Sequence, residues 1–130
     1  MTKLMLVDDS VTIRRVLKNV LNRMLKDEIE YVEAGDGIEA LEALKNNKDI
    51  ALIFLDVNMP NMNGDVFLEK MRAMKEFNAI RVVMVTTEAE KSNVVRIMKL
   101  GANGFIVKPF TPDIVRKSIT PILARLGIEV

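Results

Sequence analysis

Short apolar segments alternate with segments of helical period from one end of this 130-residue chain to the other. Between the apolar segments, apolar side chains recur every three or four residues, which is the spacing of one helix face. Five such alternations predict an α/β fold in which helices cover both faces of a parallel sheet. The expected strands cover residues 4–7, 31–32, 50–55, 80–85 and 105–107.

A helix is expected after each strand. Ser10 or Asp9 can cap the first helix, and Thr111 followed by Pro112 is a favourable start for the last one. Pro121 falls inside the apolar pattern of the last helix, where it removes a backbone hydrogen bond and clashes with the preceding turn. We therefore predict a kink or a broken final turn there. The expected helices cover about residues 11–25, 37–47, 65–75, 90–100 and 112–126.

The composition excludes several classes of chemistry. Without Cys the chain has no disulfide, thiolate nucleophile or Cys-type zinc site, and without His it has no Ser-His-Asp triad or imidazole metal site. Nineteen basic and 18 acidic residues give a net charge of +1, with no charged run typical of nucleic-acid binding. No segment has the apolar length of a membrane span or a signal peptide. We expect one cytoplasmic domain over residues 1–130.

Carboxylate, amide, hydroxyl or ammonium groups follow four of the expected strands. Ligands of an open parallel sheet bind beyond the carboxyl ends of its strands, where the winding of the chain reverses direction. If the first and third strands are neighbours, carboxylates from both converge there, with a hydroxyl and an ammonium beside them. The residues concerned are Asp8 and Asp9, Asp56 and Asn58, Thr86 and Thr87, and Lys108.

An acidic cluster of this kind favours a divalent cation, because carboxylates within a few ångströms of one another resist joint ionisation. Oxygen ligands without imidazole or thiolate are typical of Mg²⁺. A cation beside Lys108 would neutralise a phosphoryl group in transfer, which makes Asp56 a candidate nucleophile and Asp8 and Asp9 candidate metal ligands. Taken singly, each residue has an ordinary alternative as a helix cap, a turn residue or a solvated charge. Their joint placement favours the chemical interpretation.

The same segments resemble the receiver domain of two-component response regulators. This resemblance spans essentially the whole chain, and it implies a flavodoxin-like, doubly wound sheet with strand order 2-1-3-4-5 and five helices. The matching segments are LVDDS at 6–10, LDVNMPNMNG at 55–64, VTTEA at 85–89 and GFIVKPF at 104–110.

The resemblance also implies a role for each site residue. Asp56 would accept the phosphoryl group, Thr86 and Lys108 would contact it, and the Lys108–Pro109 peptide bond would be cis. On phosphorylation the Thr86 hydroxyl would move toward the phosphoryl oxygens and the ring of Phe105 would turn inward. Chemotaxis members often have Tyr at that position, so Phe105 lacks one hydroxyl contact for a partner. The implied Mg²⁺ ligands are Asp9, Asp8 mostly through water, Asp56, and the backbone carbonyl of Asn58.

Among stand-alone receivers, the chain most resembles those of chemotaxis, in its NMPNMNG loop, in the combination of Asn58 with Glu88, and in its RLG ending. The resemblance implies a histidine kinase as phosphodonor, a flagellar motor switch protein as partner and possible removal of phosphate by a phosphatase. No output domain is expected after residue 126, and we expect a monomer whose only catalysis is its own phosphorylation and dephosphorylation. The expected partner face lies on the fourth helix, fifth strand and fifth helix, with candidate residues Lys91, Arg96, Lys99 and Lys117.

Other functions remain as alternatives at this point. A flavodoxin shares the fold, but the carboxylates of VDDS would repel the phosphate of its flavin. A haloacid-dehalogenase-type phosphatase needs a second acid two residues after its nucleophile, where this chain has Asn58. A receiver that relays phosphate, or drains it from a kinase, has the same site residues as a motor regulator and stays open.

Overall fold

A parallel sheet with strand order β2-β1-β3-β4-β5 forms the centre of the fold in the computed structural model, which describes residues 1–87 and 92–130. Every pairing is parallel, and β1 lies between β2 and β3. The winding of the chain therefore reverses direction between β1 and β3, as the resemblance implied. The strands are β1 (Thr2–Val7), β2 (Ile29–Ala34), β3 (Leu52–Asp56), β4 (Arg81–Thr87) and β5 (Gly104–Lys108).

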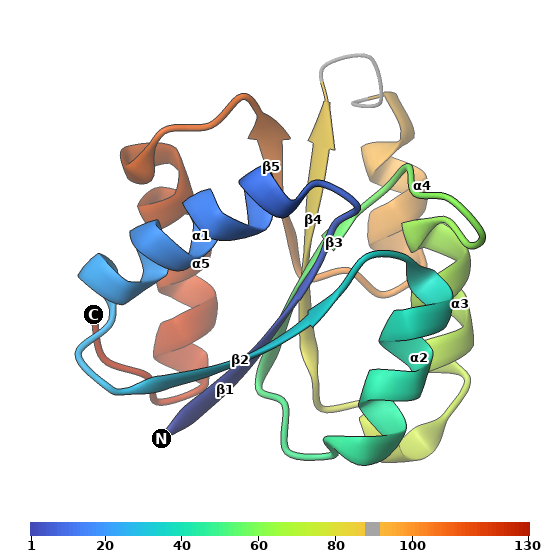
Figure 1. The fold of residues 1–130 in the computed structure, drawn as a ribbon, viewed down its shortest axis with the longest axis horizontal. Coiled ribbons are helices and arrows are strands. Elements are labelled where there is room, and N and C mark those ends of the chain that lie inside the picture. The colour runs from blue at the N-terminus through green and yellow to red at the C-terminus, as the bar shows by residue number, and fades with distance from the viewer. Residues whose placement is uncertain (88–91) are drawn as a thin grey trace.

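Helices cover both faces of the sheet, with α1 and α5 on one face and α2, α3 and α4 on the other (Figure 1). This arrangement confirms the flavodoxin-like doubly wound fold. None of the helices in the described ranges is both long and apolar enough to cross a bilayer. The helices are α1 (Val11–Met24), α2 (Gly37–Asn46), α3 (Gly64–Arg72), α4 (Val94–Lys99) and α5 (Pro112–Arg125), with a 3₁₀ helix η1 at Lys75–Phe77.

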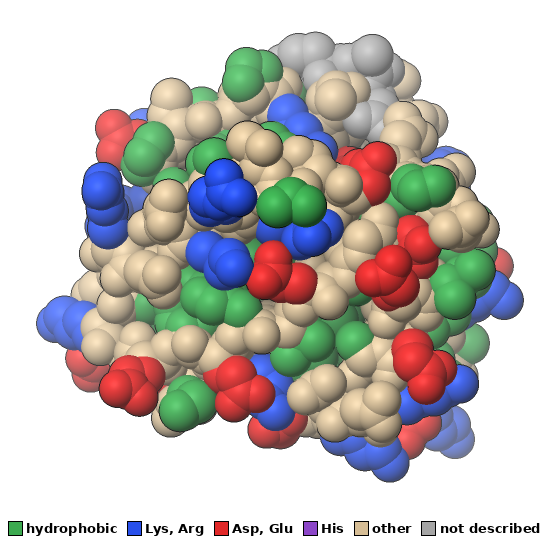
Figure 2. All heavy atoms as spheres, in the orientation of Figure 1, with side chains coloured by type: hydrophobic (Ala, Val, Ile, Leu, Met, Phe, Trp, Pro, Cys, Tyr) green, Lys and Arg blue, Asp and Glu red, His purple; other side chains and the backbone are tan. Residues whose placement is uncertain are grey.

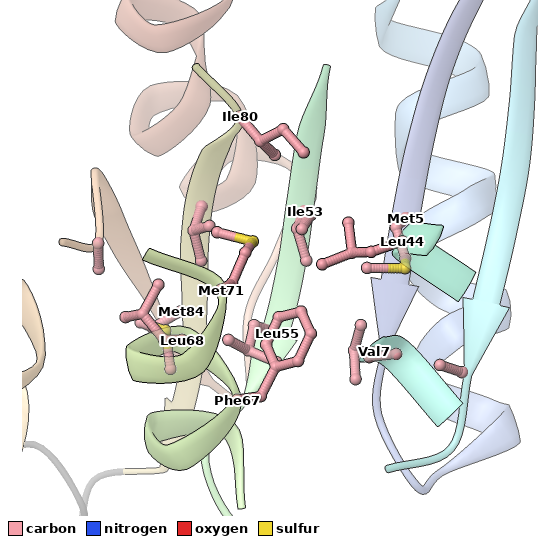
Figure 3. Close-up of a cluster of buried hydrophobic side chains, with 14 of the residues drawn as sticks. Met5, Val7, Leu44, Ile53, Leu55, Phe67, Leu68, Met71, Ile80 and Met84 are labelled. Carbon is pink, nitrogen blue, oxygen red and sulfur yellow. The ribbon is translucent and has the colours of Figure 1, made fainter. Parts of the chain in front are cut away.

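The central strands contribute side chains to two hydrophobic cores, one on each face of the sheet. Figure 3 shows Met5, Ile53 and Leu55 in the core that also receives Phe67 and Met71 of α3. Every residue of β3 is buried, including Asp56 at its end. A strand buried on both faces reads as an unbroken apolar run, which explains why the first charge after residues 50–55 marks the end of the strand.

Local hydrogen bonds account for the starts of the first and last helices. The Ile13 amide donates to the Ser10 hydroxyl at 3.2 Å, and the Ile114 amide donates to the Thr111 hydroxyl at 3.2 Å. Both residues therefore satisfy amides that have no partner inside the helix.

The third helix ends at Arg72 rather than at about residue 75, and η1 follows it. Part of the expected fourth helix, residues 90–91, lies outside the described ranges.

Pro121 does not break the last helix, so the predicted broken turn is wrong: α5 continues to Arg125. Pro121 and Lys117, whose carbonyl would have accepted the missing amide, both lie on the exposed face of α5, where water can satisfy that carbonyl. Beyond the proline, Ile122 and Leu123 are buried in the core shared with α1. Their burial holds the final turn in place against the local cost of the proline.

We expect Pro121→Ala to raise the free energy of unfolding by about 1 to 2 kcal/mol. Alanine removes a helix-interior penalty of about 3 kcal/mol, and the greater freedom of the unfolded chain offsets about 1 kcal/mol of that gain. Urea unfolding followed by far-ultraviolet circular dichroism would measure the change. Lys117→Ala, one turn earlier on the same exposed face, is the control and should change stability by less than about 0.5 kcal/mol. A less stable Pro121→Ala would contradict the prediction.

Candidate functional site

Three carboxylates converge at the carboxyl ends of β1 and β3. Asp8 and Asp9 directly follow β1, and Asp56 is the last residue of β3. One oxygen from each of the three lies within 4.8 Å of the others. Asp8 and Asp56 are buried and Asp9 is exposed, so the cluster opens to solvent on one side. The pairing of β1 with β3 brings these residues together, as the sequence predicted.

Lys108 joins two of these acids from the far side of β4. It is the last residue of β5, and its Nζ donates to Asp8 Oδ2 at 2.9 Å and to Asp56 Oδ1 at 3.3 Å. Its peptide bond to Pro109 is cis, as expected. The ammonium thus bridges a metal-ligand candidate and the candidate nucleophile, and it offsets part of their mutual repulsion.

Asp56, which is buried, and Lys108, which is half-buried, have shifted pKa values. Burial, together with the charge of Asp8, raises the pKa of Asp56 to about 6, although Lys108 acts in the opposite direction. Burial by itself would lower the pKa of Lys108. The hydrogen bond to Asp8 and the charge of Asp56 outweigh that effect, so its pKa lies above the usual value and the ammonium keeps its proton.

Thr86 and Phe105 lie on the same side of the sheet, the side covered by α3 and α4. In the register of β4 and β5, Phe105 pairs with Met84 and Thr86 pairs with Val107. Thr86 is fully buried, and its hydroxyl donates to the backbone carbonyl of Thr87 at 3.3 Å. Phe105 is 37% exposed. Both residues line one narrow pocket beneath α4, so a movement of either side chain would affect the packing of the other.

The loop from Val57 to Asn63 carries the remaining ligand candidate. Asn58 is exposed, two residues after Asp56. The loop closes tightly, because the Gly64 amide donates to the Val57 carbonyl at 2.8 Å. A Cβ atom on Gly64 would lie 1.9 Å from the backbone oxygen of Asp56, so only glycine fits at this approach. Gly64 belongs to the quoted loop motif, but its contact with Asp56 was not predicted.

A second contact, which the sequence did not predict, ties this loop to α2. Asp36 is buried, accepts the Glu39 amide at 2.8 Å as the cap of α2, and accepts Asn61 Nδ2 at 2.7 Å. Asn61 has a φ of 64°, in the left-handed region that Asn tolerates better than most residues. The spacing of Asp36 and Glu39 is a helix-cap signal visible in the sequence. The partner Asn61 is not visible there.

We expect Asp36→Ala to lower the free energy of unfolding by about 2 to 3 kcal/mol, because it removes a helix cap and leaves the Asn61 amide without its acceptor. Chemical denaturation at neutral pH would measure this loss. Asn61→Gly is the matched control, since it removes only the bond across the loop and keeps a residue suited to positive φ. Its loss should be clearly smaller. Equal losses in both variants would contradict the double role of Asp36.

The residues predicted for the partner face have different surroundings. Arg96 is not a free surface charge, because its Nη2 lies 3.0 Å from Asp65 Oδ2 on α3. Lys99 and Lys117 are exposed. Lys91, and Glu88 with which Asn58 was associated, lie outside the described ranges. A groove formed by α4, β5 and α5 exposes apolar side chains, among them Met98, Phe105 and Ile114.

The donors of the acidic cluster fit a hard cation such as Mg²⁺. All three are carboxylate oxygens, and the chain has no imidazole or thiolate that would favour a softer metal. Among residues 1–87 and 92–130, Lys108 is the hydrogen-bonding and ion-pairing partner of the buried Asp56 carboxylate, so its charge is compensated only in part. The cluster can therefore bind a divalent cation next to a carboxylate and an ammonium.

Comparisons with known proteins point to one family and to proteins of the same fold. Residues 4–120 match the model of the response regulator receiver domain family. The chain is 42% identical over 121 residues to the "Chemotaxis protein CheY homolog" of Campylobacter jejuni (strain 81-176), covering 93% of this chain and 92% of that protein. It is equally identical to "Chemotaxis protein CheY1" of Helicobacter pylori (strain J99), covering 93% and 96%. The structure of CheY4 of Vibrio cholerae has a TM-score of 0.80 at 32% identity, covering 97% and 98%.

Proposed function

Because the chain belongs to the response regulator receiver domain family, we propose that it is a phosphorylation-controlled signalling switch whose acceptor is Asp56. The observation that carries this proposal is the convergence of Asp8, Asp9 and Asp56 within 4.8 Å, with Lys108 bonded to two of them. We propose further that residues 1–130 act as one receiver domain. The relatives named as chemotaxis proteins support a role in chemotaxis.

The proposed reaction is phosphoryl transfer from a phosphohistidine of a chemotaxis-type kinase. An Oδ atom of Asp56 forms a bond to phosphorus, and the bond between phosphorus and the imidazole nitrogen breaks, leaving its electron pair on the nitrogen. Lys108 Nζ, 3.3 Å from Asp56 Oδ1, then donates to a phosphoryl oxygen. Removal of the phosphoryl group, by water or with a phosphatase, returns the carboxylate.

We assign the cation site to Mg²⁺ held by Asp8, Asp9, Asp56 and the backbone carbonyl of Asn58. The oxygen donors and their spacing support this assignment. When bound, Mg²⁺ supplies positive charge that offsets the charge on the phosphoryl oxygens during transfer. Asp9, the exposed member, faces the solvent side from which a cation can enter.

The proposed switch couples the phosphoryl group to the partner face through Thr86 and Phe105. Phosphorylation adds a charge of about −1.5 to −2 and three acceptor oxygens. The Thr86 hydroxyl would exchange the Thr87 carbonyl for a phosphoryl oxygen, and the ring of Phe105 would follow into the space beneath α4. Phosphorylation can act only by favouring this arrangement over the other one.

We propose that the output is binding to a flagellar motor switch protein through α4, β5 and α5. Exposed apolar side chains support this choice of face: Met98 and Phe105 are each 37% exposed, and Ile114 is 42% exposed. Exposed Lys99 and Lys117 border the same elements. An apolar centre with a charged rim is the usual composition of a protein-binding surface.

The acceptor is tested by incubation with Mg²⁺ and acetyl phosphate, in which acetate is the leaving group. Intact-mass spectrometry should detect one phosphoryl adduct in the wild type and none in Asp56→Asn. Asp49→Asn is the control: Asp49 pairs with Lys3, at the opposite end of the sheet, and this variant should form the adduct normally. An adduct that persists in Asp56→Asn would assign the acceptor to another residue.

The output is tested by titrating a motor-switch peptide with and without beryllofluoride, which mimics the phosphoryl group. The proposed function predicts tighter binding in the presence of beryllofluoride, with no such effect in Asp56→Asn. Formation of the adduct without a change in peptide affinity would favour a phosphate relay or sink.

A further inference from the structure

Hydrogen bonds hold both the main chain and the side chain of Asp8 in place. Its amide donates to the Ala34 carbonyl at 3.1 Å. Its carboxylate accepts the Ser10 amide at 2.8 Å through Oδ1 and Lys108 Nζ at 2.9 Å through Oδ2. The remaining polar group of the residue is its backbone carbonyl, which belongs to the peptide plane that joins Asp8 to Asp9. The orientation of this plane decides how the two carboxylates lie relative to each other.

Arg14 of α1 is the hydrogen-bond donor to that carbonyl. Its Nη1 donates to the Asp8 backbone oxygen, and its Nε donates to Glu33 Oε1 on β2 at 3.0 Å. Side chains of a helix point toward its N-terminus, so a residue in the first turns of α1 reaches back to the segment that precedes the helix. The Arg14 side chain is only 16% exposed, which indicates that it is held by packing as well as by its two bonds.

Glu33 also forms an ion pair with Lys18, which lies one turn further along α1. Lys18 Nζ donates to Glu33 Oε2 at 2.9 Å. The two basic residues therefore share one carboxylate. Arg14 also donates to Asp8, whereas Lys18 makes no hydrogen bond to Asp8 in the described part of the chain. Figure 2 shows Lys and Arg side chains gathered over α1 with an acidic side chain among them. The Arg14 guanidinium thus links Glu33 of β2 to the Asp8 carbonyl of the acidic site.

We propose that Arg14 is a positioning residue for the cation site, and that it fixes the peptide plane between Asp8 and Asp9 so that both carboxylates can face the same ion. This inference rests on the proposed function, because it assumes that the acidic cluster binds Mg²⁺. Groups that hydrogen-bond to metal-binding residues set the orientation of those residues, and their loss commonly weakens metal affinity by about 10-fold or more. The rigid fork of donors on the guanidinium lets Arg14 bond to Glu33 through Nε and to the Asp8 carbonyl through Nη1 at once.

The charge of Arg14 and its positioning role have opposite effects on cation binding. A positive charge near the site repels Mg²⁺, so loss of that charge alone would tighten binding. Loss of the fixed peptide plane would weaken binding. A weaker affinity in a variant that has lost the charge therefore identifies positioning as the cause.

The test is Mg²⁺ titration by isothermal calorimetry of the full chain, with thermal unfolding of each variant measured in the absence of the metal. We expect Arg14→Gln and Arg14→Lys to bind Mg²⁺ about 10-fold more weakly than the wild type. Lys18→Gln is the matched control, because it loses the same charge and the same partner, Glu33, without losing a bond to Asp8. We expect it to bind Mg²⁺ as tightly as the wild type or slightly more tightly, because only a positive charge is lost. The unfolding curves show that each variant is folded at the titration temperature.

Three results would overturn the inference. If the wild type binds Mg²⁺ and Arg14→Gln binds it equally or more tightly, Arg14 does not position the ligands. If Lys18→Gln is weakened as much as the Arg14 variants, the effect comes from the basic network around Glu33 rather than from the bond to Asp8. If the wild type takes up no Mg²⁺, the cation site of the proposed function fails and the inference fails with it.

Discussion

Gly64→Ala should lower the free energy of unfolding by about 3 kcal/mol or more, because overpacking against backbone atoms leaves no flexible side chain to yield. The new Cβ would lie 1.9 Å from the Asp56 carbonyl oxygen and 3.2 Å from a side-chain carbon of Leu55. Relief requires α3 to move away from the end of β3, which would also break the bond from the Gly64 amide to Val57. The loop that carries Asn58 would shift with it. Urea unfolding measures the loss, and the rate of phosphorylation by acetyl phosphate should fall as well.

Gly35→Ala is the matched control for this prediction. The nearest atom to a Cβ at Gly35 is a carboxylate oxygen of Glu39 at 3.4 Å, which is ordinary contact with a flexible side chain. Its stability should therefore change by less than about 0.5 kcal/mol. If Gly64→Ala were as stable as Gly35→Ala, the loop after Asp56 would tolerate rearrangement, and the tight approach of α3 to β3 would not be essential.

In the absence of metal, the contribution of Asp56 to the free energy of unfolding should fall as the pH rises from about 4 to about 6. The pKa of Asp56 is raised from 3.8 to about 6 in the folded state, chiefly by burial. Between these values the unfolded chain releases this proton while the folded protein retains it, so unfolding becomes more favourable as the pH rises. Above pH 6 the loss is complete. We expect it to reach about 1 to 2 kcal/mol, allowing for screening by water at the open side of the cluster.

Asp56→Asn isolates this contribution, because the amide has a similar shape and does not titrate. The variant should be more stable than the wild type above pH 6, and the difference should vanish near pH 4. Lys108 keeps a partner in the variant, since its Nζ is 2.9 Å from Asp8 Oδ2. The chain has no Trp, so urea unfolding in the presence of a chelator is best followed by far-ultraviolet circular dichroism. Parallel stability curves for the two proteins would mean that Asp56 titrates alike in the folded and unfolded states.

The strands were the most predictable part of the fold. Strands β1, β3 and β4 are buried on both faces, so their sequences contain nearly continuous apolar runs, each followed by a polar residue. Their observed ends differ from the expected ones by a few residues. Asp56, Thr86 and Lys108 are the last or next-to-last residues of their strands rather than the residues after them. This difference does not affect the site, because these side chains still lie at the carboxyl edge of the sheet.

The helices were less predictable, because local preference competes with packing. Pro121 disfavours a helix interior, yet α5 passes through it since Ile122 and Leu123 are buried beyond it. Some residues of the expected apolar faces are exposed instead: Ile38 by 53% and Val95 by 67%. Helical spacing alone shows which residues share a face. It does not show how wide a stripe the neighbouring elements cover.

The amino-acid sequence by itself determined the order of strands and helices and the kinds of group at the strand ends. Each of these depends on a short stretch of neighbouring residues, namely an apolar pattern and the turn residues that end it. The resemblance to receiver domains added the strand order and the assignment of roles. Only the tertiary structure decided which groups meet: Lys108 with Asp8, 100 positions apart, Asn61 with Asp36, 25 positions apart, and Arg14 with the carbonyl of Asp8. These contacts depend on how the elements pack in three dimensions. No local pattern of residues indicates which distant partner will satisfy a buried charge or amide.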